Sequence, residues 1–181
     1  MKESTKKEIY SWVKSIAFAF ILVFICRQFL FLPSTVLGAS MFPTFEDHDR
    51  VVVSKISEIQ RFDVIVFDAP DSDEYYIKRV IGLPGDSIEV KDDVLYINGD
   101  VYEEPYLEEN KKQTLQKRLT YDFTLDELTG ESTVPQNSLF VMGDNRAKST
   151  DSREFGFISE DSIIGEVRFR FYPIKAIGIP K

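Results

Sequence analysis

A serine and a lysine are the residues of this chain that could together carry out nucleophilic chemistry. Ser40 lies in the run GASMFPT, and Lys78 lies further along in YYIKRVIGLPGD. A serine hydroxyl becomes an effective nucleophile when a neighbouring base takes its proton. The single histidine, His48, lies in the acidic run EDHDR, and no paired carboxylate motif is visible. Lysine is therefore the remaining candidate base, and the pattern favours a Ser-Lys hydrolase.

A lysine amine can act as a base only in its neutral form. Its pKa must fall from about 10.4 by roughly 2 or more, which costs about 3 kcal/mol and is supplied by desolvation. In a strand over residues 75–81, Lys78 would share a face with Tyr76 and Val80, whereas Arg79 would point to the other face. The alternatives are a lysine that borders a sheet and a serine that caps a turn. Each motif is weak alone, and the combination carries the hypothesis.

A third polar run, GDNRAKSTDSR over residues 143–153, directly follows an apolar stretch over residues 139–142. A loop of this kind at the end of a strand can form hydrogen bonds back to a buried site. The alternative interpretation is an ordinary solvated turn.

Composition limits the classes of function that remain open. The chain has 181 residues, and about 150 would remain beyond an N-terminal anchor, enough for one compact domain. Thirty acidic residues against 22 basic ones give a net charge of −8, which argues against binding of nucleic acid. The only cysteine, Cys26, is expected to be a small packing residue, and no Cys/His cluster suggests a metal. We therefore expect no metal and no cofactor.

The N-terminal segment has the features of a membrane anchor. Residues 16–26 carry no charge, and a spanning helix needs about 20 residues, so we expect a transmembrane helix over residues 12–32 that Pro33 ends. The excess of lysine in residues 1–11 predicts a cytoplasmic tail, which places residues 33–181 on the outer face of the cell membrane in a single-pass topology. A cleaved secretory signal is the alternative. Cleavage after Gly38 would leave Ser40 near a frayed end, so we favour the uncleaved anchor.

Short β-rich runs separated by turns follow the anchor and predict a mainly β fold with an antiparallel catalytic sheet. Expected strands cover residues 50–54, 62–67, 75–81 and 138–142, and a hairpin turns at Asn98-Gly99. Alternation of Val167, Phe169 and Phe171 with arginines predicts a strand with one buried and one solvated face. Residues from about 100 to 136 are rich in charge, and we interpret them as a small inserted cap with solvated faces.

Three of these runs, SMFPT, YYIKRVIGLPGDSIEV and GDNRAKSTDSREFG, resemble the successive signature boxes of type I signal peptidases. These are membrane-bound Ser-Lys endopeptidases that remove signal peptides from exported proteins. The resemblance extends from Val36 to Pro173 in the same order. The single anchor and small size resemble the Gram-positive bacterial members.

The resemblance implies a role for each matching residue. Ser40 would be the acylated nucleophile, with its backbone N–H as one oxyanion donor, and Lys78 the general base. Some members have a serine where this chain has Gly38, so the second oxyanion donor stays unassigned. The supporting residues implied are Ser149, which would orient the lysine amine, an ion pair between Asp151 and Arg153, and a second pair between Asp144 and Arg79.

The family cuts after small residues at positions −1 and −3, and Met41, Pro43 and Ile77 are candidate walls of the corresponding pockets. The implied partners are signal-peptide-bearing secretory precursors emerging from the export machinery, together with membrane lipid.

Two other functions remain open alternatives. One is a Ser-Lys self-cleaving regulatory protease, although those carry a different N-terminal segment. The other is an inactive membrane-tethered binding module, although this chain keeps both Ser40 and Lys78.

Overall fold

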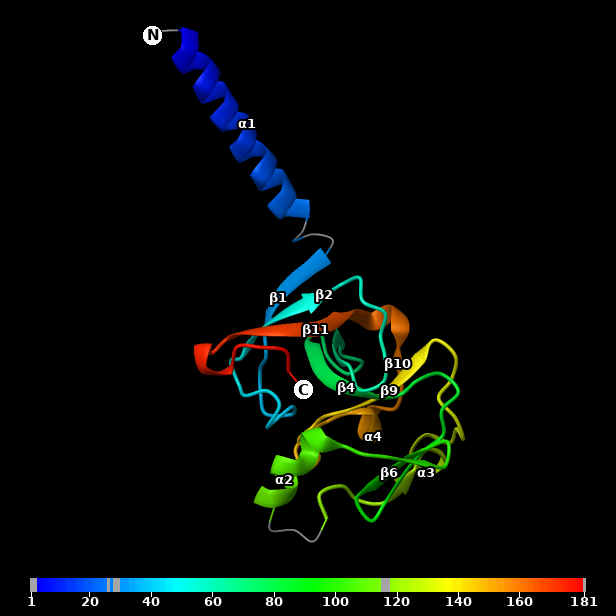
Figure 1. Ribbon diagram of the computed structural model, residues 1–181. Coiled ribbons are helices and arrows are strands. Elements are labelled where there is room, and N and C mark those ends of the chain that lie inside the picture. The colour runs from blue at the N-terminus through cyan, green and yellow to red at the C-terminus, as the bar shows by residue number, and fades with distance from the viewer. Residues whose placement is uncertain (1–2, 26, 28–29, 115–117, 181) are drawn as a thin grey trace.

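The computed structural model describes residues 3–25, 27, 30–114 and 118–180. It begins with helix α1, Glu3–Ile25 (Figure 1). Among the described residues, no helix has both the length and the apolar character needed to cross a membrane. Part of the expected anchor, including Cys26, lies outside the described residues.

The expected end of the N-terminal helix at Pro33 is wrong. Phe31–Thr35 form strand β1, in which Pro33 is the Cα partner of Val52. β1 is the outermost strand of its sheet. An edge strand accommodates proline because the missing N–H is not needed by a further strand. The chain therefore enters the sheet before the position where a helix was predicted to stop.

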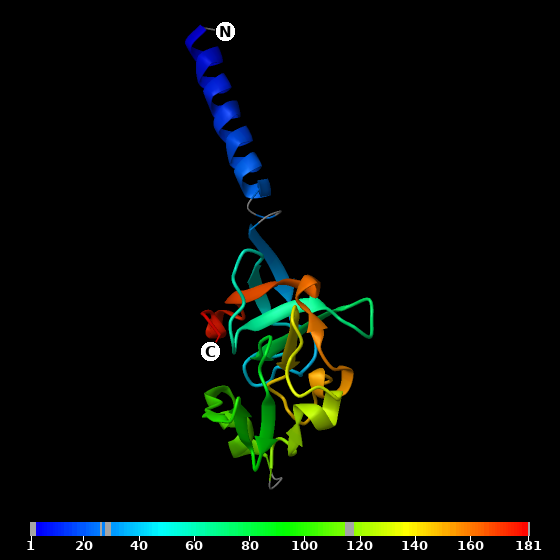
Figure 2. The same cartoon turned by 90° about the vertical axis from the view of Figure 1, so that its right-hand side faces the viewer.

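A seven-stranded sheet forms the main body, in the order β1-β2-β11-β3-β4-β9-β10, with every neighbouring pair antiparallel. The mainly antiparallel β architecture is therefore confirmed (Figures 1 and 2). Besides β1, its strands are β2 Arg50–Ser54, β3 Val64–Asp68, β4 Tyr75–Gly82, β9 Ser138–Met142, β10 Ile158–Ser159 and β11 Ile163–Tyr172.

Strand β4 is central to the site, because β3 and β9 hold it from both sides. Lys78 lies opposite Ile65, and Arg79 lies opposite Val64 and Met142. Separate buried clusters cover the two faces of the sheet, one containing Val64 and the other Ile65. A side chain at the middle of β4 is therefore held in a densely packed setting.

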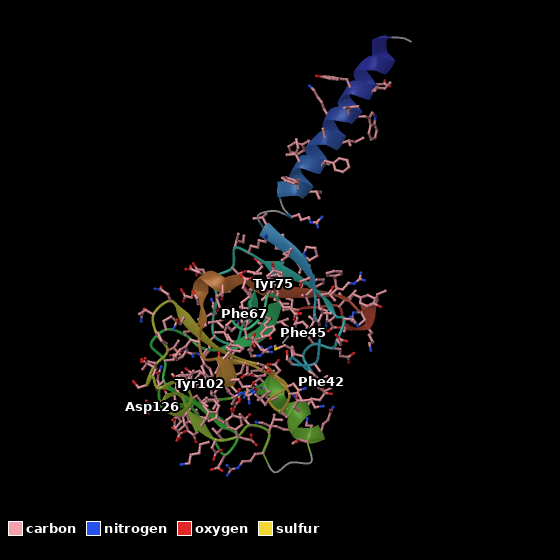
Figure 3. The ribbon with its side chains drawn as sticks, turned by 180° about the vertical axis from the view of Figure 1, so that it is seen from behind. Phe42, Phe45, Phe67, Tyr75, Tyr102 and Asp126 are labelled. Atoms are coloured by element: carbon pink, nitrogen blue, oxygen red, sulfur yellow. The ribbon has the colours of Figure 1, made fainter. Side chains whose placement is uncertain are left out.

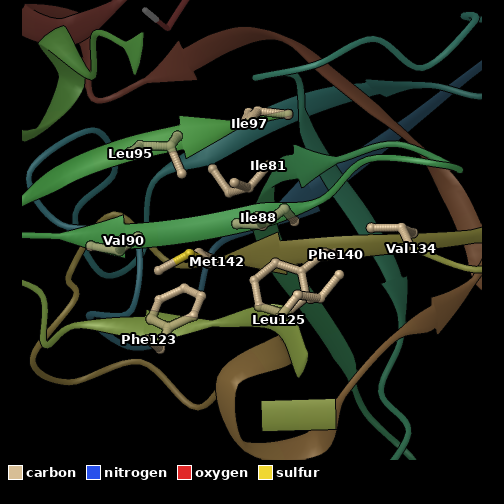
Figure 4. Close-up of a cluster of buried hydrophobic side chains, with 10 residues drawn as sticks. All are labelled: Ile81, Ile88, Val90, Leu95, Ile97, Phe123, Leu125, Val134, Phe140 and Met142. Atoms are coloured by element: carbon tan, nitrogen blue, oxygen red, sulfur yellow. The ribbon is translucent and has the colours of Figure 1, made fainter. Parts of the chain in front are cut away.

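A second sheet has four strands in the order β7-β6-β5-β8. Asn98 and Gly99 join β6 to β7 with φ angles of 55° and 85°, which confirms the predicted hairpin. Apolar side chains from this sheet and from β9 form one buried cluster (Figure 4). The elements of this region are β5 Ile88–Lys91, β6 Val94–Ile97, β7 Asp100–Tyr102, η2 Pro105–Leu107, α2 Glu108–Gln113, β8 Phe123–Thr124 and α3 Leu125–Thr129.

The second sheet, called the appended sheet below, begins at Ile88, earlier than the charge-rich stretch of residues 100–136. Solvation of charged positions is confirmed for Glu103 and Lys111, which are exposed, but not for Glu104, which is buried. Phe123 and Leu125 also belong to the buried cluster. This region therefore shares a buried core with β4 and β9 of the larger sheet and is not merely a solvated cap.

Strand β11 does not have the clean alternation that its sequence predicts. Val167 is buried, but Phe169 and Phe171 are 38% and 36% exposed. The register of β11 against β2 shifts between Val167 and Phe169 and again between Arg170 and Tyr172. Each shift changes which residues face the core. Arg170 instead reaches inward, where its guanidinium pairs with the carboxylate of Asp49 at 2.9 Å. The chain then continues through the short helices α4 Ser152–Phe155, η3 Glu160–Ser162 and η4 Ile174–Ala176.

Candidate active site

Ser40 lies on a tight loop that follows β1. The Phe42 N–H donates to the carbonyl oxygen of Ala39 at 3.2 Å, and the Phe45 N–H donates to that of Met41 at 2.9 Å. Met41 and Phe45 are completely buried and anchor the loop in the core. Figure 3 labels Phe45 within the body of the molecule. These contacts fix the backbone around Ser40 and leave its side chain partly accessible.

Lys78 extends from β4 to the same point. Its Nζ lies 3.1 Å from Ser40 Oγ and donates a hydrogen bond to the Ile77 carbonyl oxygen at 3.1 Å. The side chain is only 4% exposed, and its Nζ lies 4.9 Å from the centroid of the Tyr76 ring. The structure therefore brings the predicted nucleophile and base within hydrogen-bond reach.

Burial lowers the pKa of the Lys78 amine. Desolvation lowers the pKa of Lys78 from 10.5 to about 8, against the opposing influence of the carboxylates of Asp151 and Asp71. Removing a cation from water disfavours the charged form, while nearby negative charge favours it. Desolvation outweighs the carboxylates here. A substantial fraction of the amine is therefore neutral near pH 8.

The loop of residues 143–151 packs directly against the nucleophile. The Asn145 N–H donates to the Ser40 carbonyl oxygen at 2.9 Å, and its Nδ2 donates to that of Ala39 at 2.9 Å. A Cβ added to Gly143 would lie 2.5 Å from the Ser40 carbonyl oxygen and 2.2 Å from Ser149 Oγ. Only glycine permits this close approach.

Both predicted ion pairs are present and buried. The guanidinium of Arg79 bonds to both carboxylate oxygens of Asp144, at 2.9 and 2.7 Å. Arg153 pairs with Asp151 at 2.8 Å, and Asp151 also accepts a hydrogen bond from the Gly143 N–H at 2.9 Å. Bidentate and charge-assisted bonds of this kind fix geometry strongly. They hold the loop whose carboxylate influences Lys78.

Ser149 does not have its expected contact. It is buried, but its Oγ has no hydrogen-bond partner among the described residues. The hydrogen bonds of Lys78 Nζ run to Ser40 and Ile77 instead. Ser149 Oγ therefore lies beside the centre with unused hydrogen-bonding capacity.

The cleft at the dyad is a hollow of about 560 Å³. Ile77 lines it, as predicted, but the other two proposed wall residues do not. Met41 points into the core, and Pro43 lines a different hollow beside Tyr106. The tight turn after Ser40 carries both side chains away from the cleft. The apolar part of the wall is formed by Val36, Leu37, Ala39, Val51, Val66 and Ile77.

Residues that the sequence analysis missed connect the appended sheet to the site. Asn110 Nδ2, on α2, donates to the carbonyl oxygens of Phe42 and Asp144, both at 2.8 Å. The guanidinium of Arg146 is buried against the carboxylate of Glu104. Arg146 lies in the motif GDNR, which could have drawn attention to it. Asn110 lies in a charged run with no signal of its own.

The single histidine, His48, is an exposed loop residue whose nearest charged partner is Asp47. No group of three or more potential metal ligands occurs among the residues that the structure describes.

Comparison with known proteins agrees with this geometry. Residues 9–172 match the family described as signal peptidase, peptidase S26. The chain is 50% identical over 153 residues to signal peptidase I of Bacillus caldolyticus, which covers 82% of this chain and 84% of that protein. It is 44% identical over 176 residues to signal peptidase IB of Staphylococcus aureus strain COL, which covers 93% and 92%.

A crystal structure of a signal peptidase I from Enterococcus faecalis V583 is similar, with a TM-score of 0.59 and 46% identity. The similarity covers 61% of this chain and 97% of that one. The motifs identified in the sequence lie within the matched residues, and the structure gathers them at one cleft. The chain belongs to the signal peptidase family, peptidase S26.

Proposed function

We propose that this chain is a serine endopeptidase that removes N-terminal signal peptides from exported precursors, with Ser40 as nucleophile and Lys78 as general base. The observation that carries the proposal is the 3.1 Å separation of Ser40 Oγ and Lys78 Nζ in a buried setting. Membership of the signal peptidase family supports the reaction class.

The reaction begins when the neutral Lys78 amine takes the proton of Ser40 Oγ as this oxygen attacks the carbonyl carbon of the last residue of the signal peptide. Lys78 then gives that proton to the leaving amine, and an acyl-enzyme forms on Ser40. Water, activated by the same amine, releases the signal peptide as a carboxylic acid. The Ser40 backbone N–H is one donor to the oxyanion. The second donor stays unassigned, because Gly38 has no side chain to offer.

The remaining residues act as positioning groups. Asp151 and Arg153 hold the loop behind the dyad, and the pair of Arg79 with Asp144 supports the strand that carries Lys78. We assign to Ser149 the orientation of the Lys78 amine in the substrate complex, because its buried hydroxyl has no other partner among the described residues.

The cleft supports a preference for small side chains before the cut. Its wall near the dyad consists of short apolar and aliphatic groups such as Ala39, Val66 and Ile77. Small residues at positions −1 and −3 would fill shallow depressions of this kind, whereas long or charged side chains would not.

The N-terminal segment supports action at a membrane. Apolar side chains of α1 such as Trp12, Phe18, Phe20 and Phe24 are each more than 60% exposed, and so many large apolar side chains on one helix call for a non-aqueous environment. We therefore propose that the anchor lies within residues 12–30, ahead of β1, with residues 1–11 as a cytoplasmic tail and the chain from β1 onward as the outer catalytic part. Protease added to intact cells should digest the body and leave the N-terminal segment protected.

Purified full-length chain in detergent should cut a secretory precursor after its signal peptide. Ser40→Ala and Lys78→Ala should each lower kcat by several orders of magnitude, and the double variant should lose little more, because the two groups act as one unit. Ser132→Ala and Lys175→Ala change exposed residues of the same types and should retain activity. An inert wild type would favour a binding module, and cleavage confined to its own chain would favour a self-cleaving regulator.

A further inference from the structure

A second hollow, of about 710 Å³, opens beside the catalytic cleft. Lys148 and Thr150 line both hollows, and Ser149 lines the second. The two hollows therefore adjoin each other at the catalytic loop. Its remaining wall comes from the segment before β8 and from the catalytic loop, namely Arg118, Leu119, Tyr121, Asp122, Arg146, Ala147, Arg153 and Glu154.

The two hollows lie toward different parts of the molecule. Residues 34–40, which follow β1 and the N-terminal segment, line the first hollow. The segment of residues 118–122, which leads into β8 of the appended sheet, lines the second hollow. Figures 1 and 2 show the appended sheet at the end of the body away from β1. A precursor whose signal peptide approaches along β1 would therefore pass its mature part into the second hollow.

Lys148 lies where the two hollows meet. Its backbone N–H donates to the Asn145 carbonyl oxygen at 3.0 Å, and the Asn145 N–H donates to that of Ser40 at 2.9 Å. The turn that carries Lys148 is therefore tied to the nucleophile. Lys148 lines the same cleft as Ser40, and an extended chain advances about 3.3–3.6 Å per residue, so we expect the first few residues beyond the cut near this side chain.

Lys148 carries the cation of this hollow that has no ion-pair partner among the described residues, and the exposed carboxylate of Glu154 lines the same hollow. Arg146 pairs with Glu104, Arg153 pairs with Asp151, and Arg118 pairs with Asp92 and Asp122. Lys148 is exposed, and no carboxylate of the described part of the chain lies within ion-pair distance of it. A substrate carboxylate that passes by would meet an unpaired cation.

We propose that the second hollow binds the first residues of the mature protein, and that Lys148 makes it selective for an acidic side chain at the second or third residue after the cut. This inference deepens the proposed function and rests on it. The recognised ligand is an extended peptide with a carboxylate close behind its new N-terminus. The interaction is an exposed ion pair, so it adjusts the rate among precursors and does not decide whether cleavage occurs.

The test uses three precursors that share one signal peptide and one cleavage site, with Glu, Gln or Lys at both the second and third positions after the cut. The full-length chain in detergent is assayed for kcat/KM at low salt. The wild type should cut them in the order Glu, Gln, Lys, with a Glu-to-Lys ratio of up to about fivefold per contact. Added salt should shrink that ratio, because exposed charges are screened.

Lys148→Gln should bring the ratio close to one, and Lys148→Glu should reverse it. The matched control is Lys111→Glu, which makes the same change of charge on α2, on a side chain that lines neither hollow. This variant should retain the wild-type order. A ratio that is unaffected by Lys148, or changed equally by Lys111→Glu, would overturn the subsite. If the wild type cuts all three precursors equally, the subsite alone fails. If it cuts none, the proposed function fails as well.

Discussion

The buried amine of Lys78 should set the pH dependence of cleavage. Only its neutral form can take the proton of Ser40, and its pKa is lowered from 10.5 to about 8. About one-tenth of the amine is then neutral at pH 7, and about nine-tenths at pH 9. With an unperturbed pKa the neutral fraction at pH 7 would be some 300-fold smaller, since a difference of 2.5 in pKa corresponds to about 3.4 kcal/mol.

The expected profile of kcat/KM therefore rises about tenfold per pH unit up to pH 7.5, bends near pH 8 and is level above pH 9. This ratio reports the pKa of the free enzyme. The substrate should have no titrating group next to the cut, so that the bend belongs to the enzyme. An NMR titration of the Lys78 side chain, assigned by its loss in Lys78→Arg, gives the same pKa independently.

Two results would refute the reasoning. If kcat/KM keeps rising through pH 10, the amine is not desolvated enough to serve as the base. If the bend lies near pH 8 but the NMR titration of Lys78 does not coincide with it, another group controls the rate. Agreement of both measurements near pH 8 supports Lys78 as the base.

Three further predictions follow from the same contacts. Lys78→Met should abolish cleavage yet raise the free energy of unfolding at pH 7 by about 1–3 kcal/mol in chemical denaturation. The destabilisation by the buried cation is full below pH 8 and vanishes toward pH 10.5. A gain in stability that persists at pH 10.5 would therefore show that the buried charge is not its cause. Asp71→Asn removes a carboxylate that holds the pKa of Lys78 up, so the bend should move to lower pH, while Asp73→Asn in the same exposed loop should leave it in place; equal shifts would point to net charge alone. Gly143→Ala forces a Cβ against the Ser40 carbonyl oxygen and should lower kcat about 100-fold, while the circular-dichroism spectrum stays that of a folded protein. A near-normal kcat would show that the loop can shift to accommodate the Cβ without displacing Ser40.

Local sequence rules predicted the centre of the site well. Period-two alternation places Lys78 and Arg79 on opposite faces of β4, and the structure has Lys78 at the Tyr76 ring and Arg79 at Asp144. Asn98 and Gly99 form the predicted turn for an equally local reason, their positive φ angles. Both successes rest on the geometry of neighbouring residues along one strand or turn.

The misses depend on contacts between distant segments. Met41 was expected at the cleft because it follows Ser40, but the turn buries it against the core. The bulges of β11 come from its pairing with β2, which alternation within β11 alone does not reveal. Asn110 donates a hydrogen bond to the Asp144 carbonyl oxygen, some thirty residues away. The charge pattern of its own helix does not predict a contact with so distant a residue.

The buried pair of Arg146 and Glu104 constrains how this enzyme could be shortened or diversified. Removing the Glu104 carboxylate alone would leave the Arg146 guanidinium buried without its partner, a change that typically costs about 3–5 kcal/mol. Deleting the whole region of residues 88–129 would also remove Tyr106 and Thr120, which contact the same guanidinium. Loss of Asn110 in the same deletion would release the carbonyls of Phe42 and Asp144 together. A minimal catalyst made from the larger sheet alone would therefore lose the rigidity of its own nucleophile loop. Sequence variation in residues 88–129 should be confined to solvent-facing positions.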